Sequence, residues 1–147
     1  MDKNYMLGAY MEALKAFKED EVPVGCIIVK DDRIIAKAHN RKVKKNCAVY
    51  HAEIECLIKA ARKLKNWNLT GCDLYVTLEP CMMCTGAIVN SRIDNICFGC
   101  KDPKGGALVS NVRFKEISGL NHYPGIEGGV MEEECSELLK AFFRSKR

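Results

Sequence analysis

A histidine and two cysteines stand at the starts of two segments expected to be helical, and this constrains the fold more than any other feature. His51 precedes a segment, from Ala52 to about Leu64, whose apolar residues fall on one side of a helix. Cys81 and Cys84 open the next helical segment, after the apolar stretch DLYVTL. Three residues apart on a helix, their thiols lie on one face and can reach a single ion. The fold must therefore bring two helix N-termini together.

The order of the predicted elements indicates the fold class. A helix with an apolar stripe over residues 6–17 is followed by two strands, GCIIVK and IIAKA, around an Asp-Asp turn. After the helix at 52–64 come the strand DLYVTL, a helix whose first position suits Pro80, and the strand NICFG. This alternation predicts an α/β protein with three layers, α/β/α, in which a mixed central sheet of about five strands has helices on both faces. We expect residues 1–147 to form one domain.

The remaining segments are predicted to be loops and a last helix. NRKVKKNCAVY, at 40–50, has neither helical nor strand periodicity and indicates a basic loop. KDPKGGA and NHYPGIEGG are glycine-rich and are expected to be loops. The last helix is expected to bury an apolar side made of Met131, Cys135, Leu138, Leu139 and Phe142.

The nine cysteines favour metal ligands and reduced core thiols over disulfides. Nine is an odd number, the chain is long for a disulfide scaffold, and its N-terminal segment lacks the pattern of an export signal. No apolar run approaches the length of a membrane span. We therefore expect a soluble, cytoplasmic protein with no membrane partner.

His51, Cys81 and Cys84 are the candidate metal ligands. One histidine and two thiolates favour zinc, and three protein ligands leave a tetrahedral zinc ion one position for water, as in catalytic sites. Bound zinc can lower the pKa of that water from 15.7 to about 7. Hydrolysis also needs a group that moves a proton from water to substrate, and Glu53 lies two residues beyond the histidine. The pattern predicts a zinc-dependent hydrolase with Glu53 as its catalytic residue.

HAE followed by PCMMC resembles the H-x-E…P-C-x-x-C signature of the zinc-dependent nucleoside and nucleobase deaminases. Within that superfamily the chain is most similar to the bacterial tRNA adenosine deaminases, which convert the wobble adenosine of an anticodon to inosine. The similarity runs over nearly the full length, from EVPVG at 21–25 through LYVTLEPCMMCTGAI to the closing EC-x-x-LL-x-x-FFR.

The resemblance implies a cytidine-deaminase-like fold, one Zn²⁺ per subunit, and a homodimer that acts on a tRNA anticodon stem-loop. Activated water would attack C6 of adenine, and Glu53 matches the family's proton shuttle. The positions that match the family's zinc ligands are His51, Cys81 and Cys84. Those that match or neighbour its substrate-binding positions are Asn40, Asp102 and Lys104.

The basic loop is a candidate RNA surface. Residues 37–65 carry nine lysines and arginines against Glu53 and Glu55, although the net charge of the whole chain is only +4. Such a loop is usually a solvated surface, but beside a nucleobase pocket it could follow the phosphates of an anticodon hairpin. The candidate RNA contacts are Arg41, Lys42, Lys44, Lys45 and Arg144.

Two stretches depart from the family pattern. The family commonly has Asp-Pro-Thr-Ala before HAE, whereas this chain has Cys-Ala-Val-Tyr, ending in Tyr50. If Tyr50 lines the pocket, the size or orientation of the substrate would differ. NHYPGIEGG replaces a more varied stretch, so that RNA contact and simple surface exposure both stay open for His122 and Tyr123.

Three alternatives remain open at this point. The first is a zinc-dependent deaminase of free cytidine, deoxycytidylate or guanine, and the second is a non-catalytic zinc module that binds RNA. The third is a zinc ribbon, because Cys97 and Cys100 form a second CxxC twelve residues after the first. That spacer is shorter than the usual 15 to 20 residues, and residues three apart on a strand point to opposite faces. The cysteines expected to be core thiols are Cys26, Cys56, Cys72, Cys97 and Cys135.

Overall fold

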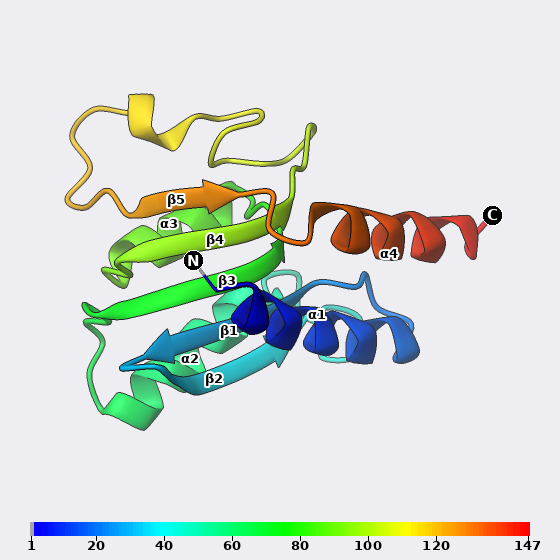
Figure 1. The fold of residues 1–147 in the computed structure, drawn as a ribbon, viewed down its shortest axis with the longest axis horizontal. Coiled ribbons are helices and arrows are strands. Elements are labelled where there is room, and N and C mark those ends of the chain that lie inside the picture. The colour runs from blue at the N-terminus through cyan, green and yellow to red at the C-terminus, as the bar shows by residue number, and fades with distance from the viewer. Residues whose placement is uncertain (1) are drawn as a thin grey trace.

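In the computed structural model, which describes residues 2–147, a five-stranded sheet lies between two layers of helices (Figure 1). The strand order is β2-β1-β3-β4-β5. The strands are β1 (Gly25–Lys30), β2 (Arg33–His39), β3 (Cys72–Leu78), β4 (Asn95–Cys100) and β5 (Gly125–Gly128). Strand β1 is antiparallel to β2 and β3, whereas β4 is parallel to both β3 and β5. The predicted mixed sheet and three-layer α/β/α fold are confirmed.

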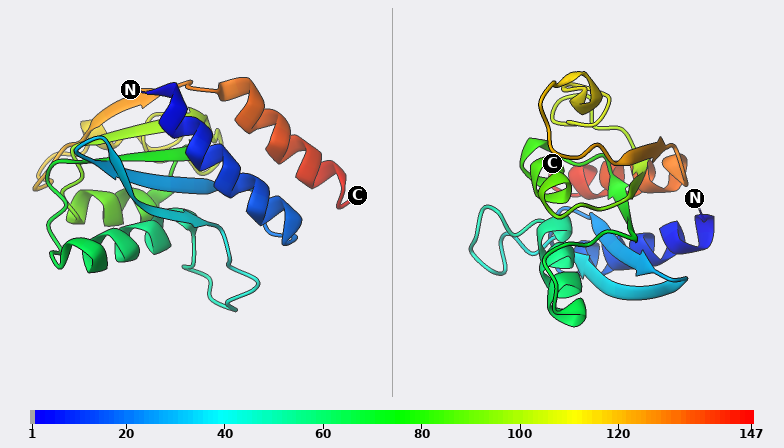
Figure 2. Two further views of the ribbon diagram at one scale, coloured as in Figure 1. Left: turned by 60° about the horizontal axis from the view of Figure 1, so that its bottom comes forward. Right: turned by 90° about the vertical axis from the view of Figure 1, so that its left-hand side faces the viewer.

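The helices divide between the two faces of the sheet. Figure 2 shows α1 (Lys3–Lys18) and α4 (Glu132–Arg144) on one face, and α2 (Ala52–Leu64) and α3 (Met82–Asn90) on the other. Helices α1 and α4 touch through Phe17 and Phe142, whose rings meet edge to face with centroids 6.0 Å apart. Within residues 2–147, no helix has both the length and the apolar character needed to cross a membrane.

The alternating side chains of the strands build a core on each face. On β1, Cys26 and Ile28 belong to the core under α2 and α3, whereas Ile27 and Val29 belong to the core under α1. Strands β3 and β4 repeat this alternation. Because helices cover both faces, nearly all residues of β1, β3 and β4 are buried, as the continuous apolar run DLYVTL predicts.

Several predicted local features are confirmed. Asp31 and Asp32 join β1 to β2 with φ angles of 50° and 59°, the left-handed backbone that a two-residue hairpin turn requires. Helix α2 begins at Ala52 and ends at Leu64. Residues 40–50, which we call the basic loop, contain turns but neither helix nor strand.

The predicted place of Pro80 is wrong. Helix α3 begins at Met82, and Cys81 is its N-cap, with φ −75° and ψ 177°. The chain is therefore extended at Cys81 and turns into the helix at Met82. This extended cap turns the Cys81 thiol toward His51, whose Nδ1 lies 3.9 Å from Sγ, so the sulfur does not follow the helical face.

Part of the stretch NHYPGIEGG, predicted to be a loop, forms the edge strand β5. It pairs in parallel with β4, from Asn95 opposite Gly125 to Phe98 opposite Gly128. The sequence GIEG has little strand propensity, so pairing with β4 sets its conformation. A Cβ at Gly128 would lie 2.2 Å from the Phe98 ring. Glycine therefore allows this edge strand to approach a buried aromatic side chain.

Helix α4 buries less of its apolar side than the sequence predicts. Cys135 and Phe142 are buried, but Leu138 and Leu139 are partly exposed, and Met131 precedes the helix as its N-cap. Figure 1 shows the reason: α4 extends past the ends of the strands, so its second half has no sheet beneath it. In that half, Phe142 packs against α1 instead.

Helix α1 lies so close to β1 that only glycine fits at position 25. A Cβ there would lie 1.9 Å from the carbonyl oxygen of Ala9 and 2.4 Å from the amide nitrogen of Ala13. We expect Gly25→Ala to lower the free energy of unfolding by about 3 kcal/mol or more, because the helix backbone would have to move away. Urea denaturation of the purified protein measures this change.

Gly8→Ala is the matched control for Gly25→Ala. Its added methyl group would meet Ile27 at 3.4 Å, an ordinary contact, and it replaces a glycine inside α1. Its free energy of unfolding should equal that of the wild type or exceed it by up to about 1 kcal/mol. Equal stability of Gly25→Ala and wild type would contradict the close approach of α1 to β1.

Candidate metal centre and its pocket

Two helix N-termini bring a histidine and two thiols together. His51 is the N-cap of α2, Cys81 is the N-cap of α3, and Cys84 lies in the first turn of α3. The Nδ1 atom of His51 lies 3.6 Å from Sγ of Cys84 and 3.9 Å from Sγ of Cys81. All three ligand atoms lie within 4.8 Å of one another. The structure thus brings the three residues predicted as metal ligands into one cluster.

This donor set fits a zinc ion. Tetrahedral zinc with Zn–S bonds of about 2.3 Å and a Zn–N bond of about 2.0 Å would place the sulfur and nitrogen atoms about 3.5 Å apart. The observed separations are close to that value. Hydrogen bonds from the Cys84 thiol and the His51 ring lower the pKa of Cys81 to about 4. The lowered pKa favours the thiolate form that zinc needs, and both helix N-termini favour this charge.

A cavity of about 200 Å³ opens beside the cluster. Val22, Val24 and Leu78 form its apolar wall. Its polar lining, apart from two of the candidate ligands, consists of Asn40, Lys42, Glu53, Glu79 and Asp102. A small cavity with an apolar wall and several polar groups is typical of a binding site for a small molecule or a single base.

Glu53 occupies the first turn of α2, two residues after His51, and only 4% of its surface is exposed. Burial raises the pKa of its carboxyl group to about 7. A carboxyl group with such a pKa can both accept and release a proton near neutral pH. Glu53 therefore lies against the cavity with the properties expected of a proton carrier.

The predicted substrate-binding residues differ in their placement. Asn40 lines the cavity, and its side chain is fixed by donating to the Val22 carbonyl at 3.3 Å and accepting from the Lys42 amide at 3.2 Å. Asp102 also lines the cavity, and its Oδ1 accepts from the Lys104 amide at 3.3 Å. Lys104 itself is not among the residues that line the cavity, and its backbone amide contributes to the turn that the Asp102 carboxylate caps.

Glu79 is a site residue that sequence reasoning missed. It is 1% exposed, and its carboxylate accepts hydrogen bonds from the backbone amides of Asp102, Leu108, Val109 and Ser110, at 2.9–3.1 Å, and from the Ser110 hydroxyl. These bonds fix residues 102–110 beside the cavity. Its sequence neighbours gave no signal of this role, because the amides that satisfy its carboxylate come from residues 102–110.

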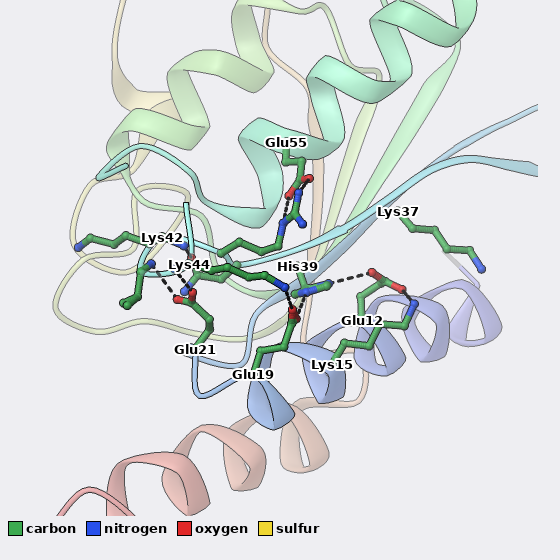
Figure 3. Close-up of polar contacts among 12 residues, drawn as sticks. Glu12, Lys15, Glu19, Glu21, Lys37, His39, Lys42, Lys44 and Glu55 are labelled. Carbon is green, nitrogen blue, oxygen red and sulfur yellow. Dashed lines mark hydrogen bonds and ion pairs between the residues drawn. The ribbon is translucent and has the colours of Figure 1, made fainter. Parts of the chain in front are cut away.

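Carboxylates at the end of α1 anchor one side of the basic loop (Figure 3). His39, the last residue of β2, lies between Glu12, 3.2 Å from its Nδ1, and Glu19, which contacts its Nε2. Glu19 also pairs with Lys44 at 3.1 Å. Glu21 is 2% exposed and accepts hydrogen bonds from two successive loop amides, those of residues 43 and 44, at 3.1 and 2.7 Å. His39 is thus held by carboxylates.

Arg41 and Tyr50 fix the other side of the loop. Nη2 of Arg41 lies 2.6 Å from Oε1 of the buried Glu55, and its guanidinium lies 5.7 Å from the centre of the Tyr50 ring. In the part of the chain that the structure describes, Tyr50 is not among the residues that line the cavity. The aromatic residue therefore packs within the loop and does not narrow the pocket.

The other singled-out residues lie away from the cavity. The His122 ring lies 2.6 Å from the Ile93 carbonyl oxygen. The Tyr123 ring stacks on Phe114, with centroids 6.1 Å apart, and its hydroxyl donates to the Ile117 carbonyl. Both residues thus hold the loop that leads to β5. Lys45 is exposed in the basic loop, and Arg144 is exposed in the last turn of α4.

The second CxxC does not form a metal cluster in the described residues. Cys97 belongs to the core under α1, whereas the Cys100 thiol donates to the Thr77 carbonyl at 3.6 Å. Among residues 2–147, the metal-compatible cluster consists of His51, Cys81 and Cys84 alone. The five predicted core thiols, at positions 26, 56, 72, 97 and 135, are all buried.

Comparisons with known proteins show which family the chain belongs to. A family model described as MafB19-like deaminase matches residues 1–147. The tRNA-specific adenosine deaminase of Bacillus subtilis (strain 168) is 43% identical over 146 residues, which cover 99% of this chain and 91% of that protein. The corresponding protein of Agrobacterium fabrum (strain C58 / ATCC 33970) is 44% identical over 144 residues, 98% of this chain and 95% of that protein. The chain belongs to the tRNA-specific adenosine deaminase family.

Solved structures agree with this membership. One, from work on A-to-I editing by tRNA:A34 deaminases at the wobble position of transfer RNA, has a TM-score of 0.90 at 42% identity and covers 93% of this chain and 99% of its own. A guanine deaminase from Nitrosomonas europaea has a TM-score of 0.83 at 21% identity, covering 97% of this chain and 84% of its own. The second likeness shows the fold alone.

Removal of one thiol tests the metal centre. We expect Cys84→Ala to lose the bound zinc that wild type retains after purification, because two protein ligands bind the ion far more weakly than three. Elemental analysis of protein purified without chelators measures the metal content. Cys97→Ala, which removes a core thiol from the second CxxC, should keep its zinc. Zinc loss from Cys97→Ala as well as from Cys84→Ala would favour the ribbon instead, because the ribbon would use all four cysteines.

The network around Glu79 predicts a dependence of stability on pH. Burial by itself would raise the pKa of Glu79, but hydrogen bonds from Ser110, Val109 and Asp102 outweigh it and hold the pKa below 4.5. The ionised carboxylate therefore contributes stability that is fully present above pH 4.5 and is lost as the pH falls through the lower folded-state pKa.

Glu79→Gln should therefore lower the free energy of unfolding by about 2 kcal/mol at pH 7, and by less as the pH falls below 4.5. Urea denaturation at a series of pH values measures both. Glu133→Gln, which changes an exposed glutamate in the first turn of α4, should lower the free energy of unfolding by less than about 1 kcal/mol at pH 7. A Glu79→Gln deficit that stays constant from pH 7 to pH 3 would contradict this origin of the stability.

Proposed function

We propose that this protein hydrolyses the wobble adenosine of a tRNA anticodon to inosine and ammonia. The observation that carries the proposal is the cluster of His51, Cys81 and Cys84 beside a cavity that Glu53 lines, in a chain more than 40% identical to tRNA-specific adenosine deaminases over nearly its whole length. Residues 1–147 would be a single zinc-dependent deaminase domain. A tRNA substrate would place the enzyme in the cytoplasm.

The chemistry assigns one role to each group. His51, Cys81 and Cys84 would hold one Zn²⁺ ion, which when bound lowers the pKa of a water molecule to about 7. Water adds to C6 of adenine, and Glu53 takes its proton and delivers it to N1. Glu53 then takes the remaining proton from the hydroxyl group on C6 and delivers it to the amino group, so that C6 becomes a carbonyl carbon, the C6–N bond breaks and ammonia leaves. Its burial beside the cavity keeps this carboxyl group close to both the water and the base.

The surroundings of the cavity suit a base that swings out of an RNA loop. An unpaired anticodon base can enter a pocket without breaking a duplex. Asn40 and Asp102 line the cavity where such a base would enter. The candidate contacts to the rest of the hairpin are Arg41, Lys42, Lys44, Lys45, Lys104 and Arg144.

We also propose that the protein is a homodimer. Helix α3 exposes 67% of Met82 and 36% of Met83. An apolar groove of about 210 Å³ lies between this helix and residues 107–120, where Ile117 is 43% exposed. Exposed apolar surfaces of this kind mark interaction sites. A second copy covering the groove would bury these side chains beside the N-terminus of α3 and thus close to the metal centre.

Inosine formation tests the function. Wild type should convert an anticodon stem-loop RNA, with adenosine at the first anticodon position, to the inosine form. Glu53→Ala should stay folded and zinc-loaded but lose at least about 100-fold in kcat, because the proton carrier is gone. Digestion of the RNA to nucleosides followed by chromatography measures the product.

Two controls make the result specific. Glu133→Gln should react like wild type, since this exposed residue of α4 is outside the cavity lining. Free adenosine, cytidine, deoxycytidylate and guanine should give little product with wild type. Product from one of these and none from the RNA would transfer the substrate to the small molecules, and full activity of Glu53→Ala would overturn the proton-carrier role.

A further inference from the structure

The cations of the basic loop are not equivalent. Arg41 is paired with Glu55 and Lys44 with Glu19, so their charges are already balanced within the protein. Lys42 and Lys45 form no ion pair within residues 2–147. Of the loop's four cations, only Lys42 lines the cavity beside the metal cluster. Lys42 is therefore an unbalanced positive charge at the candidate active site.

The backbone on both sides of Lys42 is fixed. Its own amide donates to Oδ1 of Asn40 at 3.2 Å, and the next two amides donate to the buried carboxylate of Glu21. The Glu21 amide in turn donates to the Ala16 carbonyl of α1 at 2.9 Å. Figure 3 shows the Lys42 side chain pointing away from the carboxylates that hold its neighbours. The loop is thus prearranged to present this ammonium group without ordering on binding.

The acidic groups of the cavity do not satisfy Lys42. The carboxylate of Glu79 is occupied by backbone amides and a hydroxyl. Oδ1 of Asp102 accepts from two amides of its own turn, and within residues 2–147 no ion pair joins Asp102 to Lys42. Glu53 is buried in the wall. The group that complements this unpaired lysine is therefore an anion supplied by a ligand. A nucleotide whose base fills the cavity of about 200 Å³ must leave its phosphates at the cavity mouth.

We propose that Lys42 binds a phosphate next to the target nucleotide and so makes the pocket select adenosine within an RNA chain over free adenosine. Glu21 is the positioning residue that holds Lys42 at the cavity. This inference rests on the proposed function, because it assigns the anion to the RNA that carries the target base. It distinguishes Lys42 from Arg41 and Lys44, which shape the loop, and assigns substrate discrimination to one side chain.

Salt dependence separates a phosphate contact from a structural effect. Each phosphate contact to single-stranded nucleic acid adds about 0.7 to the slope of log affinity against log salt. We expect Lys42→Gln to reduce kcat/KM for the anticodon stem-loop about tenfold at low salt, chiefly through KM, and to reduce its salt slope by about 0.7. Lys42→Arg should restore both, because it keeps the charge.

The matched control is Lys63→Gln. Lys63 is also an exposed lysine without an ion pair within residues 2–147, but it lies in the last turn of α2, at the opposite end of that helix from His51. Lys63→Gln removes the same charge as Lys42→Gln, but at a position outside the cavity lining. Its kcat/KM and salt slope should therefore match those of wild type. Equal losses in Lys42→Gln and Lys63→Gln would mean that overall charge, not a contact at the cavity, determines the effect, and would overturn the proposal.

Glu21→Gln tests the positioning role. It keeps the bulk of the side chain but presents an amide NH₂ to one of the two loop amides. It should raise KM while leaving kcat nearly unchanged, and it should add little to the loss in a Lys42→Gln background, because both changes act through the same contact. Full additivity of the two losses would show that Glu21 acts independently of Lys42.

Binding measurements keep this inference separate from the proposed function. Equilibrium binding of the stem-loop to Glu53→Ala, with and without Lys42→Gln, gives the same salt-slope comparison without turnover. If wild type forms no inosine but the slopes differ by about 0.7, the proposed function fails and the phosphate contact stands. If wild type forms inosine but the slopes are equal, the phosphate contact fails alone.

Discussion

The direction of the strands determines where the site lies, because β1 alone is antiparallel to the other four strands. Because β1 is antiparallel to both of its neighbours, β2 and β3 point the same way, and β4 and β5 follow them. The strands β2, β3 and β4 therefore end at one edge of the sheet, at His39, Leu78 and Cys100. Cavity residues follow each of these ends, since Asn40 and Glu79 come next and Asp102 comes two residues later. Ligand sites of α/β proteins occur at this edge because the chain there turns from strands into helices.

Buried carboxylates then give the loops at this edge a fixed shape. Glu79 holds the segment after β4, and Glu21 holds the basic loop after β2, in both cases through successive backbone amides. An unpaired buried carboxylate would be costly, so neither loop can move away without leaving a charge unsatisfied. The same bonds that stabilise the fold therefore keep the pocket in its binding geometry before any ligand arrives, which lowers the entropy cost of binding.

The parts of the molecule that were predictable from sequence are those set by local pattern. The hairpin at Asp31 and Asp32, the bounds of α2, and the placement of His51 at a helix start follow from turn chemistry and helical periodicity. Strand β5 was not predictable, because GIEG takes its conformation from pairing with β4. Glu79 and Glu21 look like surface acids in sequence, since the amides that bury and satisfy them are supplied by distant segments. Helix α3 begins at Met82 and not at Pro80, because Cys81 forms an extended N-cap. Hydrophobic periodicity does not reveal such a cap.

The electrostatics of the pocket also depend on contacts between distant segments more than on local sequence. Counted along the sequence, the region at 37–65 is strongly basic, but Arg41, Lys44 and Lys59 are paired with carboxylates in three dimensions. Glu19 reaches Lys44 from α1, outside the region, and Glu55 reaches Arg41 from α2. The field at the cavity therefore depends less on the number of cations in the loop than on Lys42, which lines the cavity and forms no ion pair within residues 2–147. The number of cations predicts long-range attraction to a polyanion. Which cation binds a particular phosphate depends instead on which side chains are already paired within the protein.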